Sequence, residues 1–156
     1  MQVVTKGRLV TIRLVLADDH EVVRSGIQTL LSGSNIEIIG AAATVDETVA
    51  LTVSDKPDVV LLDVRMGAAD GLSALESIRI QAPEVAVVMM STYDNPTYVA
   101  RAIALGAKDY ILKDSSRIDV LEAIQRAASS EKPSDNSILR RVQMTMEKRK
   151  DRSDSK

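Results

Sequence analysis

The sequence predicts an α/β fold, a doubly wound sheet of five parallel strands, and two observations lead to that prediction. Five short apolar runs alternate with segments whose apolar residues recur at helical spacing. Most of the runs are continuous, which is typical of strands covered on both faces. The runs are residues 12–17, 36–42, 59–62, 85–90 and 110–112. Five strand–helix units in succession favour right-handed crossovers that place helices on both faces of the sheet.

The first two helices follow the first two runs. Apolar residues with the spacing i, i+4, i+7 and i+8 predict the first helix, at Val23, Ile27, Leu30 and Leu31. The run 36–42 includes Glu37 and Gly40, so we expect it to be an edge strand. Thr44 and Glu47 have the spacing of a capping box, which predicts the start of the second helix.

The other three helices are predicted from their ends and their apolar residues. The third follows Asp70-Gly71 and presents Leu72, Leu75 and Ile78. In the fourth, Asn95 is the predicted N-cap, Pro96 the first helical residue and Gly106 the residue just beyond the end. The fifth is predicted to begin near residues 115–116.

The predicted domain organisation has three parts. Residues 1–11 form an N-terminal extension, residues 12–130 the folded domain, and residues 131–156 a linker and tail. The stretch 131–137 is rich in polar and turn-forming residues, which indicates a linker. Ile138, Val142 and Met146 could line a short helix, and we expect disorder from Lys148 onward, where the tail is polar.

Composition excludes several classes of protein. The chain has no cysteine, so disulfides, thiolate metal sites and a cysteine nucleophile are ruled out. No apolar run approaches the roughly 18 residues needed to cross a bilayer, and no signal peptide is recognisable, so we expect a cytoplasmic protein with no membrane partner. The net charge is −2 overall and +4 over residues 138–156, which leaves −6 for the rest. Nucleic acid is therefore not an obvious partner of the acidic body.

Polar residues end or follow four of the predicted strands: Asp18 and Asp19 after the first, Asp63 after the third, Ser91 after the fourth and Lys113 after the fifth. The carboxyl ends of parallel strands meet at one edge of a sheet, where ligands bind in such folds. Carboxylates held a few ångströms apart repel one another, so the site needs a cation or a raised pKa. Both outcomes are more typical of chemistry than of packing.

Four stretches together resemble the receiver domain of two-component response regulators. They are residues 15–20 (VLADDH), 61–66 (LLDVRM), 90–92 (MST) and 106–113 (GAKDYILK), within a resemblance that covers residues 12 to 130. Their order and spacing are specific, although each stretch alone is weak. The resemblance implies a flavodoxin-like (βα)5 fold with strand order 2-1-3-4-5. The sequences of the first and last stretches resemble those of the NarL/FixJ subfamily, whose members usually add a LuxR-type helix-turn-helix.

The resemblance implies a role for each residue at the acidic edge. Asp63 would accept a phosphoryl group from a histidine kinase or phosphotransfer protein. Asp19 and Asp63 would bind Mg²⁺ directly, Asp18 mainly through water, and the Arg65 carbonyl would add a ligand; Mn²⁺ could substitute. Lys113 would neutralise the phosphoryl oxygens.

Three further residues have roles that the resemblance leaves less settled. Ser91 would donate its hydroxyl to the phosphoryl group, with Thr92 as the competing candidate. Tyr110 would be the switch aromatic that changes rotamer as Ser91 moves, or a packing residue of the last strand. His20, the only histidine, is interpreted as a polar residue at a helix start.

The sequence departs from the family pattern in three places. Gly67 stands where many members have proline, which makes the loop after Asp63 less constrained. Asp114 replaces the proline that often follows the active-site lysine, so we expect a trans peptide there. Arg65 and Tyr93 occupy the positions that tune access of water to the phosphoryl group, and their bulk predicts slow self-dephosphorylation.

Several functions are weighed against these residues. The favoured one is a signalling module, not a turnover enzyme, in which phosphorylation changes a partner or dimer surface. A Mg²⁺-dependent phosphohydrolase would need a general acid where Arg65 stands. DNA binding would require a C-terminal helix-turn-helix for which residues 131–156 leave no room. The chain is thus interpreted as part of a transcriptional regulator, with a stand-alone receiver as the alternative.

Overall fold

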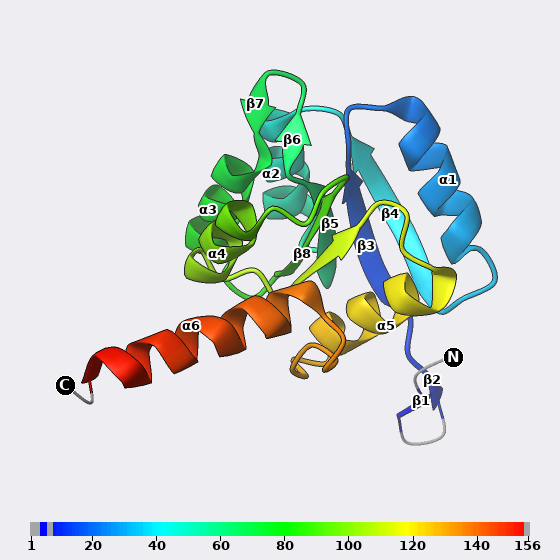
Figure 1. The fold of residues 1–156 in the computed structure, drawn as a ribbon. Helices are drawn as coiled ribbons and strands as arrows, with labels where there is room; N and C mark the ends of the chain where they lie inside the picture. Colours follow the sequence, from blue (N-terminus) through cyan, green and yellow to red (C-terminus); the bar gives the residue numbers. More distant parts are fainter. Residues whose placement is uncertain (1–3, 6–7, 155–156) are drawn as a thin grey trace.

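The computed structural model describes residues 4–5 and 8–154, and its centre is a five-stranded parallel sheet (Figure 1). The order across the sheet is β4–β3–β5–β8–β9. The strands are β3 (Ile12–Ala17), β4 (Ile36–Ala42), β5 (Val59–Asp63), β8 (Ala86–Ser91) and β9 (Asp109–Leu112). Counted along the chain this is 2-1-3-4-5, so the predicted fold and the edge position of residues 36–42 are confirmed.

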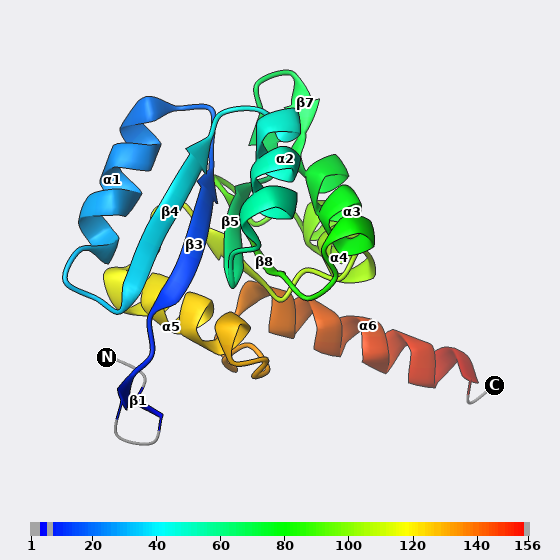
Figure 2. The ribbon, with the colours of Figure 1, turned by 180° about the vertical axis from the view of Figure 1, so that it is seen from behind.

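Helices cover both faces of the sheet (Figures 1 and 2). The helices α1 (Glu21–Leu31) and α5 (Arg117–Ala128) lie on one face, and α2 (Val45–Asp55), α3 (Gly71–Gln81) and α4 (Pro96–Ala104) lie on the other. Alternate residues of β3 feed the two layers: Leu14 and Leu16 join the first, Val15 and Ala17 the second. Both layers are almost wholly aliphatic, as expected for a chain without Phe or Trp. Within the described part of the chain, no helix has the length and apolarity to cross a membrane.

The predicted helix starts are confirmed by their caps. The side chain of Thr44 accepts a hydrogen bond from the Glu47 amide at 3.1 Å. Asn95 caps α4 in the same way, and Ser116 caps α5. Each bond satisfies an amide that would otherwise lack a partner in the first turn, which is worth about 1 kcal/mol. Gly106 has a φ of +91° at the end of α4, the left-handed conformation that glycine adopts without strain.

Two short hairpins were not predicted. β1 (Val4–Thr5) pairs with β2 (Arg8–Leu9), inside the predicted N-terminal extension, of which residues 1–3 and 6–7 lie outside the described residues. β6 (Arg65–Met66) pairs with β7 (Ala69–Asp70), directly after Asp63. Strands of two residues are too short to produce a periodic pattern. The turn of the second hairpin uses Gly67 at a φ of +64°, a conformation disfavoured for other residues.

The prediction of disorder from Lys148 onward is wrong. Residues Ile138–Asp154 form one helix, α6, of 17 residues, and residues 155–156 lie outside the described residues. Its first turn has a cap, because the Ser137 hydroxyl accepts a hydrogen bond from the Arg140 amide at 3.3 Å, and it buries Leu139. A nucleated helix extends at little cost through residues of good helix propensity such as Lys, Arg, Glu and Met. Polarity alone was therefore a poor guide to disorder here.

The Asp109 carboxyl, buried at the start of β9, leads to a pH-dependent prediction. Burial raises its pKa above the ordinary value of 3.8, against the opposing hydrogen bonds from Ser137 and the Tyr110 amide. A raised pKa means that the folded protein holds this proton where the unfolded chain has lost it. The resulting stabilisation is complete below pH 3.8 and is lost as the pH rises through the folded-state pKa.

Asp109→Asn keeps an acceptor oxygen but does not titrate, so it is the reference for that prediction. The wild type is expected to gain stability relative to Asp109→Asn as the pH falls from 7 toward 4. Urea unfolding of both proteins across this pH range measures the difference between their free energies of unfolding. The other carboxyls contribute nearly equally in both proteins, so their contributions largely cancel. A difference that stays constant with pH would contradict the prediction.

Candidate functional site

The residues predicted to form a site do converge at the carboxyl edge of the sheet. Asp18 and Asp19 follow β3, Asp63 ends β5, Ser91 ends β8 and Lys113 follows β9. A pocket of about 510 Å³ opens there and is lined by Asp63, Ser91 and Lys113 among others. Sheet topology explains the convergence, because β3, β5, β8 and β9 run parallel as neighbours and end at the same edge.

Lys113 joins two of the carboxylates. Its amine lies 2.9 Å from Asp63 Oδ2, to which it donates a hydrogen bond, and 2.9 Å from Asp18 Oδ2 as an ion pair. Asp18 is fully buried and Asp63 is 3% exposed. Burial raises the pKa of Asp63, and the hydrogen bond from Lys113 opposes that rise. For Lys113, burial lowers the pKa but the bonds to Asp18 and Asp63 outweigh it, so the pKa is raised and the amine stays charged.

The acidic cluster has the donor set of a divalent cation site. One ligand atom from each of Asp18, Asp19, His20 and Asp63 lies within 4.8 Å of the others. Asp18 Oδ2 and Asp19 Oδ1 are buried atoms, and among the described residues their close polar neighbours are Lys113 Nζ and His20 Nδ1, each 2.9 Å away. Carboxylate oxygens clustered in this way suit a hard cation such as Mg²⁺. One lysine cannot neutralise three carboxylates, so a bound cation would complete the charge balance.

His20 takes a position that the sequence did not suggest. It is the N-cap residue of α1, as its interpretation as a helix-start residue implied, but its side chain makes no cap hydrogen bond. Its Nδ1 instead lies 2.9 Å from Asp19 Oδ1 and 3.3 Å from Asp18 Oδ1. The Asp-Asp-His order of the sequence was the only available signal for this contact.

Backbone contacts hold the Asp63 carboxylate in place. The Arg65 amide donates to Asp63 Oδ1 at 3.1 Å. The Val64 amide donates to the Met90 carbonyl of β8 at 2.9 Å, which keeps the two strands paired to their ends. The Arg65 guanidinium donates to the Tyr98 hydroxyl of α4 at 3.3 Å. Sequence reasoning missed this link from the Asp63 loop to α4.

The β8–α4 loop connects the site to Tyr110. Ser91 Oγ accepts from the Tyr93 amide at 3.1 Å, and the Tyr110 hydroxyl donates to the Tyr93 carbonyl at 3.2 Å. Burial raises the pKa of the Tyr110 phenol, and the neighbouring Ser91 hydroxyl partly offsets the rise. Tyr110 is 1% exposed, so its ring points inward. Thr92 is exposed, whereas Ser91 faces Tyr110.

The departures from the family pattern are visible in the backbone. All peptide bonds of the described residues are trans, so the predicted trans bond between Lys113 and Asp114 is confirmed. The Lys113 amide donates to the Ser91 carbonyl at 2.8 Å, which fixes the lysine beside β8 without a proline. Tyr93, one of the two residues predicted to slow dephosphorylation, is 74% exposed at the pocket rim.

A parallel sheet of this order, with carboxylates and a lysine meeting at its carboxyl edge, defines the class of phosphorylation-dependent receiver domains. The chain belongs to the response regulator receiver domain family, whose profile matches residues 14–125. It is a signalling module of two-component systems, in which a histidine kinase is the phosphoryl donor. The expectation drawn from the four sequence stretches is thereby confirmed.

Comparison with individual proteins agrees with this assignment. The chain is 34% identical over 140 residues to the response regulator protein VraR of Staphylococcus aureus, covering 89% of this chain and 67% of VraR. It is 31% identical to the signal receiver domain of a NarL response regulator from Mycobacterium tuberculosis, with a TM-score of 0.73 over 78% of this chain and 99% of that one. A LuxR-family response regulator from Aurantimonas has the same fold, at 23% identity and a TM-score of 0.79 over 87% of this chain and 98% of that one.

Proposed function

We propose that this chain accepts a phosphoryl group on Asp63 from a sensor histidine kinase or phosphotransfer protein, in a reaction that requires Mg²⁺ or Mn²⁺. The proposal rests on the position of Lys113. Its amine lies 2.9 Å from the carboxylates of both Asp18 and Asp63. A carboxylate beside a fixed cation stays available as a nucleophile despite its burial. The Lys113 ammonium group also lies where the negative charge of an incoming phosphoryl group would need to be neutralised.

The transfer itself needs little covalent work from the protein. An Asp63 oxygen attacks the phosphorus, the new P–O bond forms, and the P–N bond to the donor imidazole breaks with its electron pair remaining on the nitrogen. Lys113 keeps its proton throughout and orients the nucleophile. Asp18, Asp19, Asp63 and the Arg65 carbonyl would hold the cation, which would neutralise phosphoryl oxygens when bound.

Ser91 is the proposed phosphoryl-binding hydroxyl, and its contact with Tyr110 favours it over Thr92. Movement of Ser91 toward the phosphoryl group would change the surroundings of the Tyr110 ring, which is the proposed readout. Arg65 and Tyr93 are proposed to restrict attack by water. No general acid stands at Arg65, so the domain catalyses only its own phosphorylation and dephosphorylation.

The output is proposed to be a surface that binds a partner or a second copy of the chain. VraR is longer than this chain, which spans about two thirds of its length. We therefore propose that residues 12–130 are the receiver and that 131–156 lead to a helix-turn-helix that binds DNA. A receiver acting alone through protein contacts is the second candidate.

Acetyl phosphate with Mg²⁺ is expected to add one phosphoryl group to the protein, detected by intact mass, because the site supplies both the nucleophile and the neutralising charges. The Asp63→Asn variant should show no addition, and chelation of the metal should reduce labelling of the wild type at least about tenfold. The decay of the label in the same sample should be slow, over many minutes, if Arg65 and Tyr93 exclude water. Equal labelling of wild type and Asp63→Asn would refute the assignment of Asp63.

A further inference from the structure

Helix α6 lies across α4 and β9 instead of covering a face of the sheet (Figures 1 and 2). Leu139 is 3% exposed and belongs to the same apolar layer as Tyr110, with Ile138 and Val142 packed against it. Residues 144–152 are exposed, and the helix extends beyond the body of the domain (Figure 1). The apolar packing of α6 on the domain is therefore made by its first turns, at Ile138, Leu139 and Val142.

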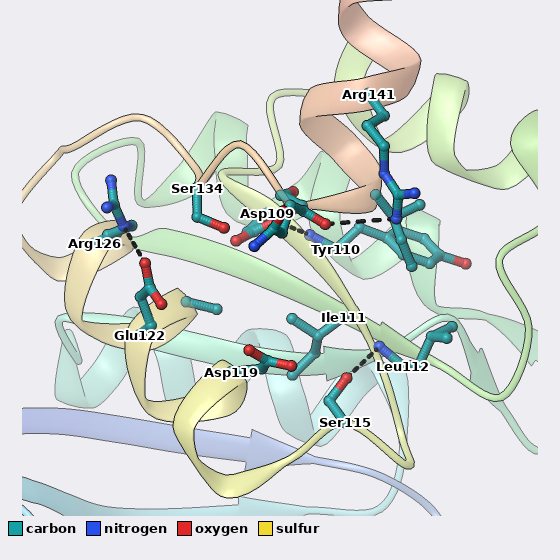
Figure 3. A pocket seen from close by; sticks show the side chains of 14 residues that line it. Asp109, Tyr110, Ile111, Leu112, Ser115, Asp119, Glu122, Arg126, Ser134 and Arg141 are labelled. Atoms are coloured by element: carbon teal, nitrogen blue, oxygen red, sulfur yellow. Dashed lines mark hydrogen bonds and ion pairs between the residues drawn. The ribbon is translucent and has the colours of Figure 1, made fainter.

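One hydrogen bond fixes the start of α6 to β9. The Ser137 hydroxyl donates to Asp109 Oδ1 at 2.6 Å while it accepts from the Arg140 amide. Asp109 is 5% exposed, so water does not readily replace this bond. A groove of about 220 Å³ lies between α5, the linker and the start of α6, and Asp109 and Ser137 are among the residues that line it (Figure 3). The contacts that keep α6 in place are thus concentrated on α4 and β9.

The same short strand touches the phosphoryl-binding groups. Lys113 follows β9 directly, and Tyr110 is the second residue of the strand. The Tyr110 hydroxyl is bonded to the Tyr93 carbonyl in the loop that begins at Ser91. Its ring belongs to the apolar layer that includes Leu139 of α6. A movement of Ser91 that frees Tyr110 would therefore alter the apolar layer that Leu139 completes.

We propose that α6 is an intramolecular cover of the α4–β9 surface, fastened by the Ser137–Asp109 hydrogen bond, and that phosphorylation of Asp63 loosens it. The proposal rests on the proposed function of Asp63. Coupling between two sites is reciprocal, so loosening α6 must also favour phosphorylation. The surface uncovered on α4 and β9 is then free for the partner or second copy that the output requires.

Hydrogen exchange of the full chain tests this, with the intact mass of each sample recording its phosphorylation. Labelling with acetyl phosphate and Mg²⁺ is expected to speed amide exchange of residues 138–143 by about fivefold or more, the lower end of allosteric couplings. Complete labelling with unchanged exchange there would overturn the proposal while leaving the function of Asp63 intact. Absence of labelling would sink the proposed function and this inference with it.

A variant tests the fastening without any phosphoryl group. Ser137→Ala should speed exchange of residues 138–143 in the unphosphorylated protein and raise the fraction labelled at limiting acetyl phosphate. Ser134→Ala is the matched control, because within the described chain the Ser134 side chain makes no hydrogen bond, and it should change neither quantity. Protection of the β5 and β8 amides reports that each variant is folded. A Ser137→Ala protein that is folded but unchanged in both readouts would contradict the proposal.

Discussion

Replacing Lys113 with alanine is expected to lower the free energy of unfolding by about 3 kcal/mol without Mg²⁺, because it leaves two buried carboxylates beside each other without their shared cation. Asp18 is fully buried and Asp63 is 3% exposed, so solvent cannot take over the role of the amine. The expected loss lies at the low end of the range for a broken buried ion pair because the Lys113 side chain is 19% exposed. Urea denaturation in the presence of a chelator measures the change.

The same variant should respond more strongly to Mg²⁺ than the wild type. Without the lysine, the full charge of Asp18 and Asp63 attracts the cation, and a ligand that binds only the folded state stabilises it in proportion to its affinity. Lys132→Ala, at an exposed lysine of the linker, is the control and should shift stability by no more than about 0.5 kcal/mol. Equal stability of Lys113→Ala and wild type, or equal gains with Mg²⁺, would show that the lysine does not offset the carboxylate charges.

Gly71→Ala is expected to destabilise the protein by about 3 kcal/mol and to reduce labelling of Asp63 sharply. A Cβ at position 71 would overlap the carbonyl oxygen of Asp63 and come within 2.9 Å of that of Val64. Both neighbours are backbone, which cannot turn aside as a side chain can, so the end of β5 must move. The Gly71 amide also donates to the Val64 carbonyl at 2.6 Å, so α3 begins directly against the strand that carries Asp63.

Gly26→Ala provides the matched control for that prediction. Gly26 lies in the interior of α1, is exposed, and has nothing within 4 Å of an added Cβ. Alanine there should stabilise the protein by about 0.5–1 kcal/mol through helix propensity and should leave labelling unchanged. Thermal or urea unfolding together with intact mass measures both variants. If Gly71→Ala is as stable and as readily labelled as Gly26→Ala, the close approach of α3 to Asp63 is not needed for stability or for phosphorylation.

The five strands and five helices of the receiver were predictable because each had a signal of its own. Continuous apolar runs predicted the buried strands, and side-chain caps such as Asn95 predicted where helices begin. The convergence of Asp18, Asp63 and Lys113 followed from topology, since parallel neighbours end at the same edge. The strands and helices depend on short stretches of sequence, and the convergence of the site residues depends on one rule of sheet topology.

The features that were missed depend on contacts between distant residues. The hydrogen bond between Asp109 and Ser137 joins positions 28 residues apart, and neither residue alone suggests it. The length of α6 was underestimated because its nucleation relies on that contact and on the burial of Leu139. The bond from Arg65 to Tyr98 spans 33 residues in the same way. Tertiary packing, which periodicity does not encode, decides such cases.

The distribution of aromatic residues has a practical consequence. The chain has three tyrosines and no tryptophan. Tyr93 lies in the β8–α4 loop, Tyr98 in α4 and Tyr110 in β9; the first two line the pocket beside Asp63, and the Tyr110 hydroxyl is bonded to the Tyr93 carbonyl. The ultraviolet emission of the unlabelled protein therefore arises from this one region, and the aliphatic remainder of the fold is optically silent. Tyrosine emission can therefore follow the region where phosphorylation would be read out, with no dye or engineered residue.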